Sequence, residues 1–271
     1  MRRRRWPLLS LLAFGYAFLY VPILLLIVYS FNESRLVTVW SGFSIKWYRE
    51  LLHNQQLLEA AWLSVRIAAV NATLAVVLGT LAANALVRHG RFRGRNAFEL
   101  LLTAPLVMPD VIIGLSMLLL FVAMQHGLGW PDGRGFTTIA IAHITFSTAY
   151  VAVVVRTRLA QMDASLEEAA MDLGARPLTV YLRITLPLIA PALLSGWLLA
   201  FTLSLDDLVI ASFVSGPGST TLPMVVYSSV RMGVSPQINA LATLIVAVVT
   251  LAVIIAGVTS LHGPRAARRR R

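Results

Sequence analysis

The sequence predicts an all-α membrane protein that crosses the bilayer several times. Of its 271 residues, 58% are apolar and only 13% are charged. The mean hydropathy is +0.76, far from the value of a soluble globular domain. A helix needs about 20 mostly apolar residues to cross a bilayer, and segments of this kind recur along the whole chain. The predicted fold class is therefore a polytopic helical membrane protein with a single transmembrane domain, 1–271.

Six transmembrane helices are predicted, and they leave no room for a separate soluble domain. Their approximate bounds are 7–31, 58–87, 98–124, 136–155, 187–214 and 238–261. The first segment follows a cluster of arginines and has a secretory signal peptide as its alternative. It is longer than the apolar core of a signal and ends without a small-residue cleavage site, so we interpret it as a retained span.

The arginines predict how the spans are oriented. With six spans both termini lie on one side, and the loops then alternate between the two sides. Most arginines fall on the side of the termini, in the segments 2–5, 88–95, 156–183 and 265–271. By the positive-inside rule both termini are cytoplasmic, together with the loop 158–186 and the basic tail 262–271. The net charge of +11 then orients helices and meets anionic lipid, and it does not indicate nucleic-acid binding.

Residue patterns that would support an enzyme or a metal site are missing from the sequence. The only lysine, Lys46, belongs to no glycine-rich phosphate loop. The five histidines have no metal-binding spacing, and there is no cysteine. The sequence also lacks a Gly-x-Ser-x-Gly nucleophile elbow. We therefore expect no catalytic residue, no metal site and no cofactor held by this chain.

The loop between the fourth and fifth spans combines acidic and small residues. Helix formers dominate 163–173, Gly174 offers the left-handed backbone that ends a helix, and Pro177 can begin the next one. A helix, a tight turn and a second helix are therefore predicted. On the first helix a small apolar strip is expected from Ala169, Ala170 and Leu173. The acidic residues expected to stay in water or to meet a partner are Glu167, Glu168 and Asp172.

The same loop carries a family resemblance. The sequence Glu168-Ala169-Ala170, three residues, Gly174, nine residues, Ile184, one residue, Leu186-Pro187 is similar to the signature loop of ABC-importer permeases of the binding-protein-dependent type. The segments 29–32, 104–110 and 204–218 resemble the polyamine permeases of that family. The resemblance therefore covers essentially the whole chain.

The resemblance implies a fold, a location and a set of partners. The fold is that of a type I ABC-importer permease in a bacterial inner membrane. In that family the loop forms coupling helices that dock into a cytoplasmic ATPase, which is present in two copies and binds ATP and Mg. Carried over by position, Glu168, Ala169, Ala170 and Gly174 transmit its closure to the membrane helices. A second, related permease, an external binding protein and a polyamine cargo, with putrescine favoured, are implied as well.

Three acidic residues fall inside predicted spans, where an ionised carboxylate costs at least ~2.5–3.5 kcal/mol at the helix centre. Asp206 and Asp207 lie in the fifth span and Asp110 in the third. Neighbouring helical positions point about 100° apart, so at most one of the adjacent pair squarely faces a cavity, with Asp206 slightly favoured. Asp110 follows Pro105 and Pro109, which can break the helix and expose backbone groups. Cargo contact and hydrogen-bonded packing remain open for all three acids.

Several alternatives stay open at this point. Trp197, deep in the fifth span, is either a packing residue or a cavity wall. The cargo alternatives are spermidine or another small cationic or opine-like amine. A proton-driven secondary transporter using Asp110, His143, Asp206 and Asp207 is a different class, and a membrane anchor without transport is a third. The Gly174→Asp substitution separates the ATP-coupled importer from the proton-driven transporter, because only the importer depends on the loop.

Overall fold

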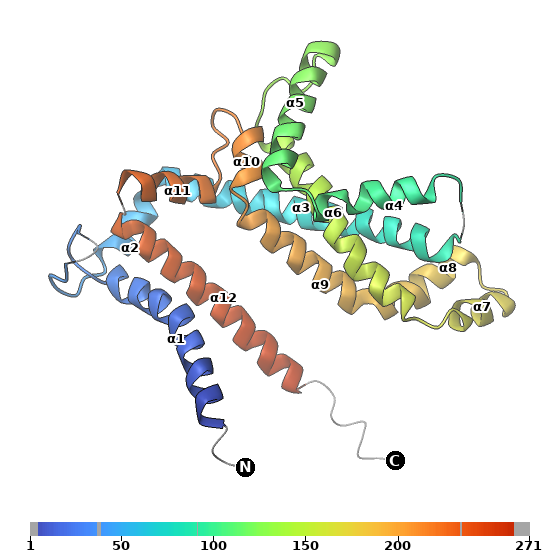
Figure 1. Cartoon of the computed structure of the whole chain (residues 1–271), viewed down its shortest axis with the longest axis horizontal. Coiled ribbons are helices and arrows are strands. Elements are labelled where there is room, and N and C mark those ends of the chain that lie inside the picture. Colours follow the sequence, from blue (N-terminus) through green and yellow to red (C-terminus); the bar gives the residue numbers. More distant parts are fainter. Residues whose placement is uncertain (1–4, 37–38, 91, 234, 263–271) are drawn as a thin grey trace. The chain divides into compact units, whose positions relative to one another are not determined.

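The computed structural model describes residues 5–36, 39–90, 92–233 and 235–262 (Figure 1). Within these ranges the chain is helical, and a single isolated β-bridge joins Asn32 to Phe43. The helices in order are α1 Arg5–Ser30, α2 Lys46–His53, α3 Gln55–Arg88, α4 Arg95–Thr103, η1 Ala104–Leu106, α5 Asp110–Leu128, α6 Phe136–Ala160, α7 Ser165–Asp172, α8 Pro177–Val180, η2 Tyr181–Thr185, α9 Leu186–Leu205, α10 Val209–Val214, α11 Leu222–Met232 and α12 Pro236–His262.

The chain forms two compact units, which we describe separately. The terminal unit comprises residues 1–58 and 226–271, and the central unit comprises residues 59–225. The loop with the family motif and the three acids of the predicted spans all belong to the central unit.

In the terminal unit, α1 and α12 pack against each other and run antiparallel, so the beginning of α1 and the end of α12 lie at the same end (Figure 1). Polar contacts fix the opposite end. The buried Trp47 of α2 donates its Nε1–H to the carbonyl of Asn32 at 2.6 Å. Gln237 of α12 accepts from Asn54 at 2.9 Å and donates to Glu50 at 3.0 Å.

In the central unit, α6 packs most closely with α9, and glycines let the helices approach. Val151 of α6 is fully buried. A Cβ atom on Gly79 of α3 would lie 2.8 Å from Val151 Cγ1, and one on Gly196 of α9 would lie 3.3 Å from it. Asn71 of α3 adds polar contacts, because its Nδ2 donates to Ser147 Oγ at 3.0 Å and to a carbonyl of α9 at 2.8 Å. Small residues and buried amides hold membrane helices together in this way.

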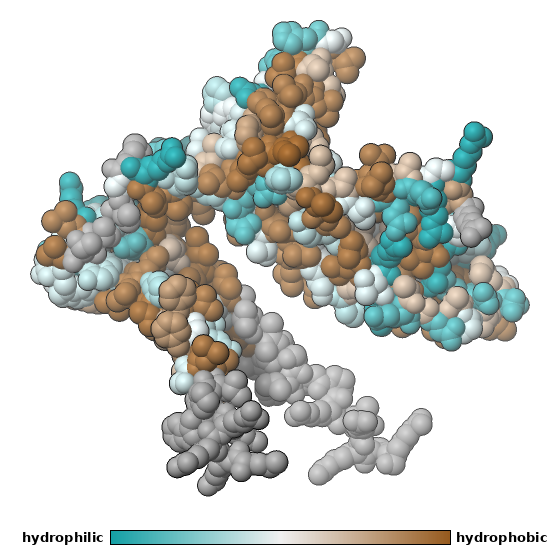
Figure 2. All heavy atoms as spheres, in the orientation of Figure 1, coloured by the Kyte–Doolittle hydropathy of each residue, from teal (hydrophilic) through white to brown (hydrophobic). Residues whose placement is uncertain are grey.

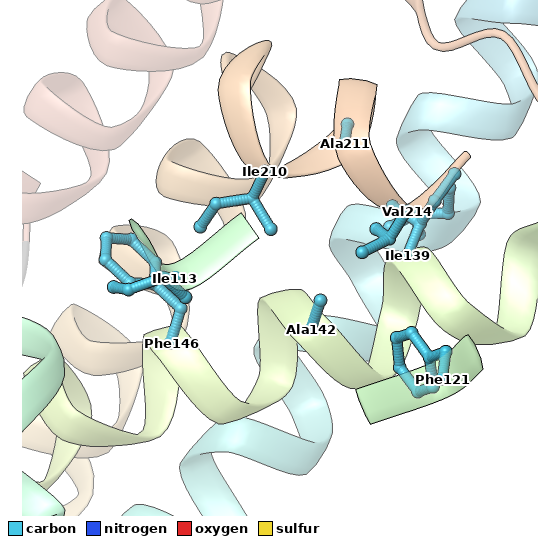
Figure 3. Close-up of a cluster of buried hydrophobic side chains, with 9 residues drawn as sticks. Ile113, Phe121, Ile139, Ala142, Phe146, Ile210, Ala211 and Val214 are labelled. Carbon is cyan, nitrogen blue, oxygen red and sulfur yellow. The ribbon is translucent and has the colours of Figure 1, made fainter. Parts of the chain in front are cut away.

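A second core cluster lies where the short helix α10 meets α5 and α6. Figure 3 shows this cluster, in which apolar side chains from the three helices lie close together. Its members include Ile113 and Phe121 of α5, Ile139, Ala142 and Phe146 of α6, and Ile210, Ala211 and Val214 of α10. A helix of six residues has little stability alone, so this packing holds α10 in place.

Five helical segments are long and apolar enough to cross a membrane, as far as the described residues show. They are Leu9–Ser30, Gln55–Arg88, Asp110–Leu128, Phe136–Ala160 and Pro177–Leu205, and a shorter apolar stretch is Pro236–Leu251. These six segments follow the six predicted spans in order. The basic clusters at 2–4 and 263–271 lie outside the described residues.

The third and fifth predicted spans differ from the structure because each contains a break. The span predicted at 98–124 is interrupted at 104–109, and the helix of spanning length begins at Asp110. Pro109 supplies no N–H and disfavours helical geometry at the residue before it. The span predicted at 187–214 is interrupted between Leu205 and Val209, where Asp207 accepts hydrogen bonds from the backbone of the next helix.

The surface of the central unit is strongly apolar along the helices. Figure 2 shows apolar side chains along α5 and hydrophilic residues toward the end of this unit where α3, α7 and α8 meet. The exposed residues of α5 include Leu115, Leu119 and Leu120. An apolar surface of this kind needs lipid or partner helices to cover it.

Candidate functional site

The loop between α6 and α9 ends its first helix on Gly174, as the sequence predicts. The φ angle of Gly174 is +88°, a conformation that other residues rarely adopt. The N–H of Gly174 donates to the Met171 carbonyl at 2.8 Å, and the N–H of Ala175 donates to the Ala170 carbonyl at 3.1 Å. These two bonds form a Schellman motif. The predicted start of the next helix at Pro177 is also confirmed.

The beginning of α7 is fixed by an aspartate. The carboxylate of Asp163 accepts a hydrogen bond from the Ser165 backbone N–H at 3.0 Å. This bond, with a second from the Ser165 hydroxyl, holds the pKa of Asp163 below its ordinary value. Glu167 and Glu168 follow in the first turn, where negative charge is favourable beside the helix N-terminus.

The two adjacent glutamates point into different surroundings. Glu167 Oε2 lies 3.0 Å from Arg88 Nε, and its Oε1 accepts from Thr185 Oγ at 2.6 Å. Glu168 and Asp172 are exposed and have no side-chain partner among the described residues. Glu167 thus differs from the prediction that it stays in water or meets another protein, because residues of α3 and η2 occupy its carboxylate.

The apolar residues of the loop are largely exposed. Ala169 is exposed, Ala170 is half-buried, and Leu173 is 90% exposed. Leu166, Met171 and Leu178 add further exposed apolar surface. In the second half of the motif, Ile184 and Leu186 are half-buried and Pro187 is exposed. The loop therefore offers an apolar surface bordered by two carboxylates.

Sequence reasoning missed two residues of this site, Arg88 and Thr185. In the sequence, Arg88 is one of the arginines that indicate the orientation of the spans. Its place at the end of a predicted span also puts it near the cytoplasmic loops. Thr185 sits inside the motif at a position that the family pattern leaves undefined. The π-helical turn Tyr181–Thr185 that directs Thr185 toward Glu167 has no signal in the apolar pattern.

The second part of the site is the break after α9, where Asp207 is fully engaged. Its carboxylate accepts from the backbone N–H of Ala211 at 2.7 Å and of Ile210 at 3.3 Å. His143 Nε2 lies 3.1 Å from the same carboxylate, and His143 Nδ1 lies 2.7 Å from Ser204 Oγ. His143 and Ser204 are buried. Both ring nitrogens of His143 therefore have a hydrogen-bond partner.

Asp206, the neighbour of Asp207, has a different environment. Its backbone N–H closes α9 by donating to the Thr202 carbonyl at 3.2 Å, whereas its side chain is exposed. No ion-pair partner for its carboxylate occurs in the part of the chain that the structure describes. Both aspartates lie in the break between α9 and α10, and Asp206 is the more exposed of the two.

The remaining candidates are Asp110 and Trp197. Asp110 is the first residue of α5, directly after Pro109, and its side chain is exposed. The helix N-terminus favours its negative charge. Trp197 donates its Nε1–H to Thr73 Oγ at 3.2 Å and stacks on Phe201 with ring centroids 5.2 Å apart, which is a packing arrangement. Within the described ranges, no three His, Asp or Glu side chains converge to hold a metal ion.

Comparison with known proteins identifies relatives of this chain. Residues 75–268 match the family described as binding-protein-dependent transport system inner membrane component. The putrescine transport system permease protein PotI of Escherichia coli K12 is 65% identical over 247 residues, which cover 91% of this chain and 88% of that protein. The spermidine/putrescine transport system permease protein PotC of the same strain is 45% identical over 241 residues, covering 89% and 88%.

Solved structures share the fold at low sequence identity. A bacterial ABC transporter involved in import of the acidic polysaccharide alginate aligns with a TM-score of 0.70 and 18% identity, covering 96% of this chain and 97% of that one. The MetNI methionine ABC transporter aligns with a TM-score of 0.60 and 15% identity, covering 76% and 94%. The all-α permease fold is common to all of them. This chain therefore belongs to the family of binding-protein-dependent transport system inner membrane components and is a multi-pass inner-membrane permease subunit of an ABC importer, a transport protein rather than an enzyme.

Proposed function

We propose that this permease carries putrescine across the inner membrane into the cytoplasm. The observation that carries the proposal is the 65% identity, over 91% of the chain, to a permease named for putrescine transport. A second permease, named for spermidine and putrescine, is 45% identical. Spermidine is therefore the next candidate cargo, ahead of other small cationic or opine-like amines.

The environment of Asp206 suits a cationic cargo. Putrescine carries two ammonium groups separated by an apolar linker, and an ammonium group binds best to a carboxylate that has no competing cation. The carboxylate of Asp206 is accessible at the end of α9, whereas that of Asp207 is occupied by His143 and the backbone of α10. Interrupted helices are a common construction for transport sites. Asp206 is accordingly the candidate cargo contact, and Asp110 at the start of α5 is the second.

The proposed assembly contains several partners. The importer contains two copies of a cytoplasmic ATPase that binds ATP and Mg, and one copy docks on α7 of this chain through its exposed apolar surface and the carboxylates of Glu168 and Asp172. A second, non-identical permease covers the apolar faces of the membrane helices and encloses the path. An external binding protein delivers the polyamine. The exposed apolar residues of α5 and α7 support such contacts.

The test of this function is uptake of labelled putrescine in cells that lack their own polyamine importers. The cells express the chain with its ATPase, partner permease and binding protein. Gly174→Asp should abolish uptake at normal membrane levels, because an aspartate at φ +88° is strained by roughly 1–2 kcal/mol and displaces the end of α7. The test compares this variant with the unchanged complex.

A matched control is Gly129→Asp. Gly129 also ends a helix, α5, with a φ angle of +68° and open space around it, but it lies outside the loop. Uptake should largely survive this change. An assembled wild-type complex that takes up no putrescine would contradict the cargo, and full uptake by Gly174→Asp would contradict the role of the loop.

A further inference from the structure

Three separate helical segments meet at one carboxylate, that of Glu167. Arg88 is the last residue of α3, and its guanidinium contacts both oxygens of Glu167, at 3.0 Å from Nε to Oε2 and 3.3 Å from Nη2 to Oε1. Thr185 is the last residue of η2 and donates its hydroxyl to Oε1 at 2.6 Å. We call these three residues the Glu167 cluster.

The Glu167 cluster is shielded from water. The side chains of Arg88 and Glu167 are 20% and 15% exposed, and Thr185 is buried. An ion pair in such a place, with the Nη2–H of Arg88 donating to the carboxylate, is screened less by water and salt than an ion pair on an open surface. Removing either charge leaves the other without its partner in a partly desolvated site.

The apolar core does not hold α7 in place. None of the eight residues of α7, all of which are described, is buried. Beside the cluster lies an open pocket of about 250 Å³, bordered by Asn84, Tyr181 and Met171, so the helix is not packed solidly against α3. Glu167 makes the polar side-chain contacts that join α7 to α3 and η2 in the part of the chain that the structure describes.

The partner segments lead directly into the membrane. The π-helical turn Tyr181–Thr185 continues into α9 without a break, and α9 ends at Leu205, directly before Asp206, the candidate cargo contact. Arg88 terminates α3, which packs on the core around Val151. A displacement of Glu167 therefore acts on the ends of two helices, one of which reaches the proposed transport path. Isolated π turns are frequent at functional sites.

We propose that Glu167 is a positioning residue that ties the coupling helix α7 to α3 and α9, and that Arg88 and Thr185 are its anchors. The neighbouring glutamate has a separate task, since Glu168 is exposed and free to contact the ATPase. The inference rests on the ATPase docking proposed above, but it does not depend on which amine is carried. Loss of the link uncouples ATP hydrolysis from transport.

The test is a charge swap in the reconstituted complex with its partner subunits and binding protein. The variants are Arg88→Glu, Glu167→Arg and the double variant that exchanges the two residues. Each single variant should raise the number of ATP molecules hydrolysed per putrescine imported by roughly tenfold. A change of this size lies within the range that coupling between two sites of one protein typically produces. The half-saturating putrescine concentration should stay unchanged. The double variant should recover a ratio near that of the wild type.

A milder variant guards against misfolding. Glu167→Gln keeps the shape of the side chain and can still accept from Thr185, but it removes the charge that Arg88 binds. It should assemble normally and show a smaller rise of the same ratio. A second glutamate–arginine pair, Glu99 with Arg156 at 2.5 Å, joins α4 to α6 outside the loop and is the matched control. Its charge reversals should leave the ratio unchanged.

The outcomes separate the positioning role of Glu167 from the identity of the cargo. A normal ratio in the assembled single variants, or a proportional loss of hydrolysis and uptake, contradicts the positioning role. Failure of the assembled double variant to recover the ratio contradicts it as well. A wild-type complex that hydrolyses ATP in response to its binding protein but takes up no putrescine contradicts the cargo alone, and the same variants then test coupling through the hydrolysis that the binding protein stimulates.

Discussion

Two adjacent aspartates after α9 have different surroundings, and the difference comes partly from a residue far away in the chain. Asp207 is bound by His143 and by the backbone of α10, whereas Asp206 is exposed. Because neighbouring helical positions point about 100° apart, the sequence predicts that the two side chains diverge. It does not show which carboxylate is occupied, because His143 approaches from a different helix and Ile210 donates only after the break has formed.

Neutralising these aspartates one at a time should give different defects. Asp207→Asn weakens the contact with His143 and the acceptance of two backbone N–H groups, and should lower the stability of the purified protein by about 1–3 kcal/mol. Asp206→Asn should leave the unfolding temperature unchanged but reduce putrescine uptake, because the carboxylate proposed to meet the ammonium group is lost. Thermal unfolding in detergent and labelled uptake measure the two effects.

The control for this pair is the double variant, which should show both defects. Wild-type uptake by Asp206→Asn at normal membrane levels would remove Asp206 from the cargo path. Unchanged thermal stability of Asp207→Asn would show that the bonds at the break contribute little to the fold.

At the scale of single helices, the sequence predicts where the helices lie better than it predicts where a helix is interrupted. The order of the spans follows directly from apolar length, and the turn at Gly174 and Pro177 follows from backbone chemistry. The break near Pro109 agrees with the two prolines that predict it, whereas the break near Asp207 is harder to predict, because the apolar pattern runs through it. The π turn before α9 adds a single residue to a helical turn and leaves no mark in composition.

Helix contact in the central unit depends on the absence of a side chain at Gly79. A Cβ atom there would lie 2.8 Å from Val151 Cγ1 and 3.0 Å from the backbone nitrogen of Ala152. Because part of this obstacle is backbone, the helices must move apart. Gly79→Ala should therefore lower stability by about 1–3 kcal/mol, the usual cost of overpacking. Thermal unfolding of the purified protein measures the change.

Gly127 of α5 provides the matched comparison, because a Cβ atom there meets nothing within 4 Å. Gly127→Ala should be neutral or slightly stabilising, as expected for alanine in place of glycine inside a helix. Equal stability of both variants would mean that α3 and α6 can separate without loss, contrary to the packing around Val151.

For the whole molecule, the sequence identifies the family because its motifs lie at fixed spacings along the entire chain. The loop motif is the strongest of these, and the structure presents Glu168 and Ala169 of that motif on an exposed surface. The sequence does not predict that Glu167 is bound within the chain while its neighbour Glu168 is exposed. Glu167 is held by Arg88, which is 79 residues earlier in the chain, and only the packed helices bring the two together.

Assembly with the ATPase should depend on exposed apolar residues of the loop that contribute nothing to the fold of this chain. Leu173 is 90% exposed at the end of α7, so Leu173→Asp loses no internal packing and should leave thermal stability unchanged. At an interface that buries this side chain, a carboxylate is desolvated without a partner, at a penalty of several kcal/mol. The amount of ATPase that copurifies with the tagged permease should then fall by at least about tenfold, which corresponds to 1.4 kcal/mol. Leu128→Asp, at the end of α5 and 74% exposed, is the control and should retain the full amount. Undiminished copurification with Leu173→Asp would show that the ATPase does not dock on this end of α7.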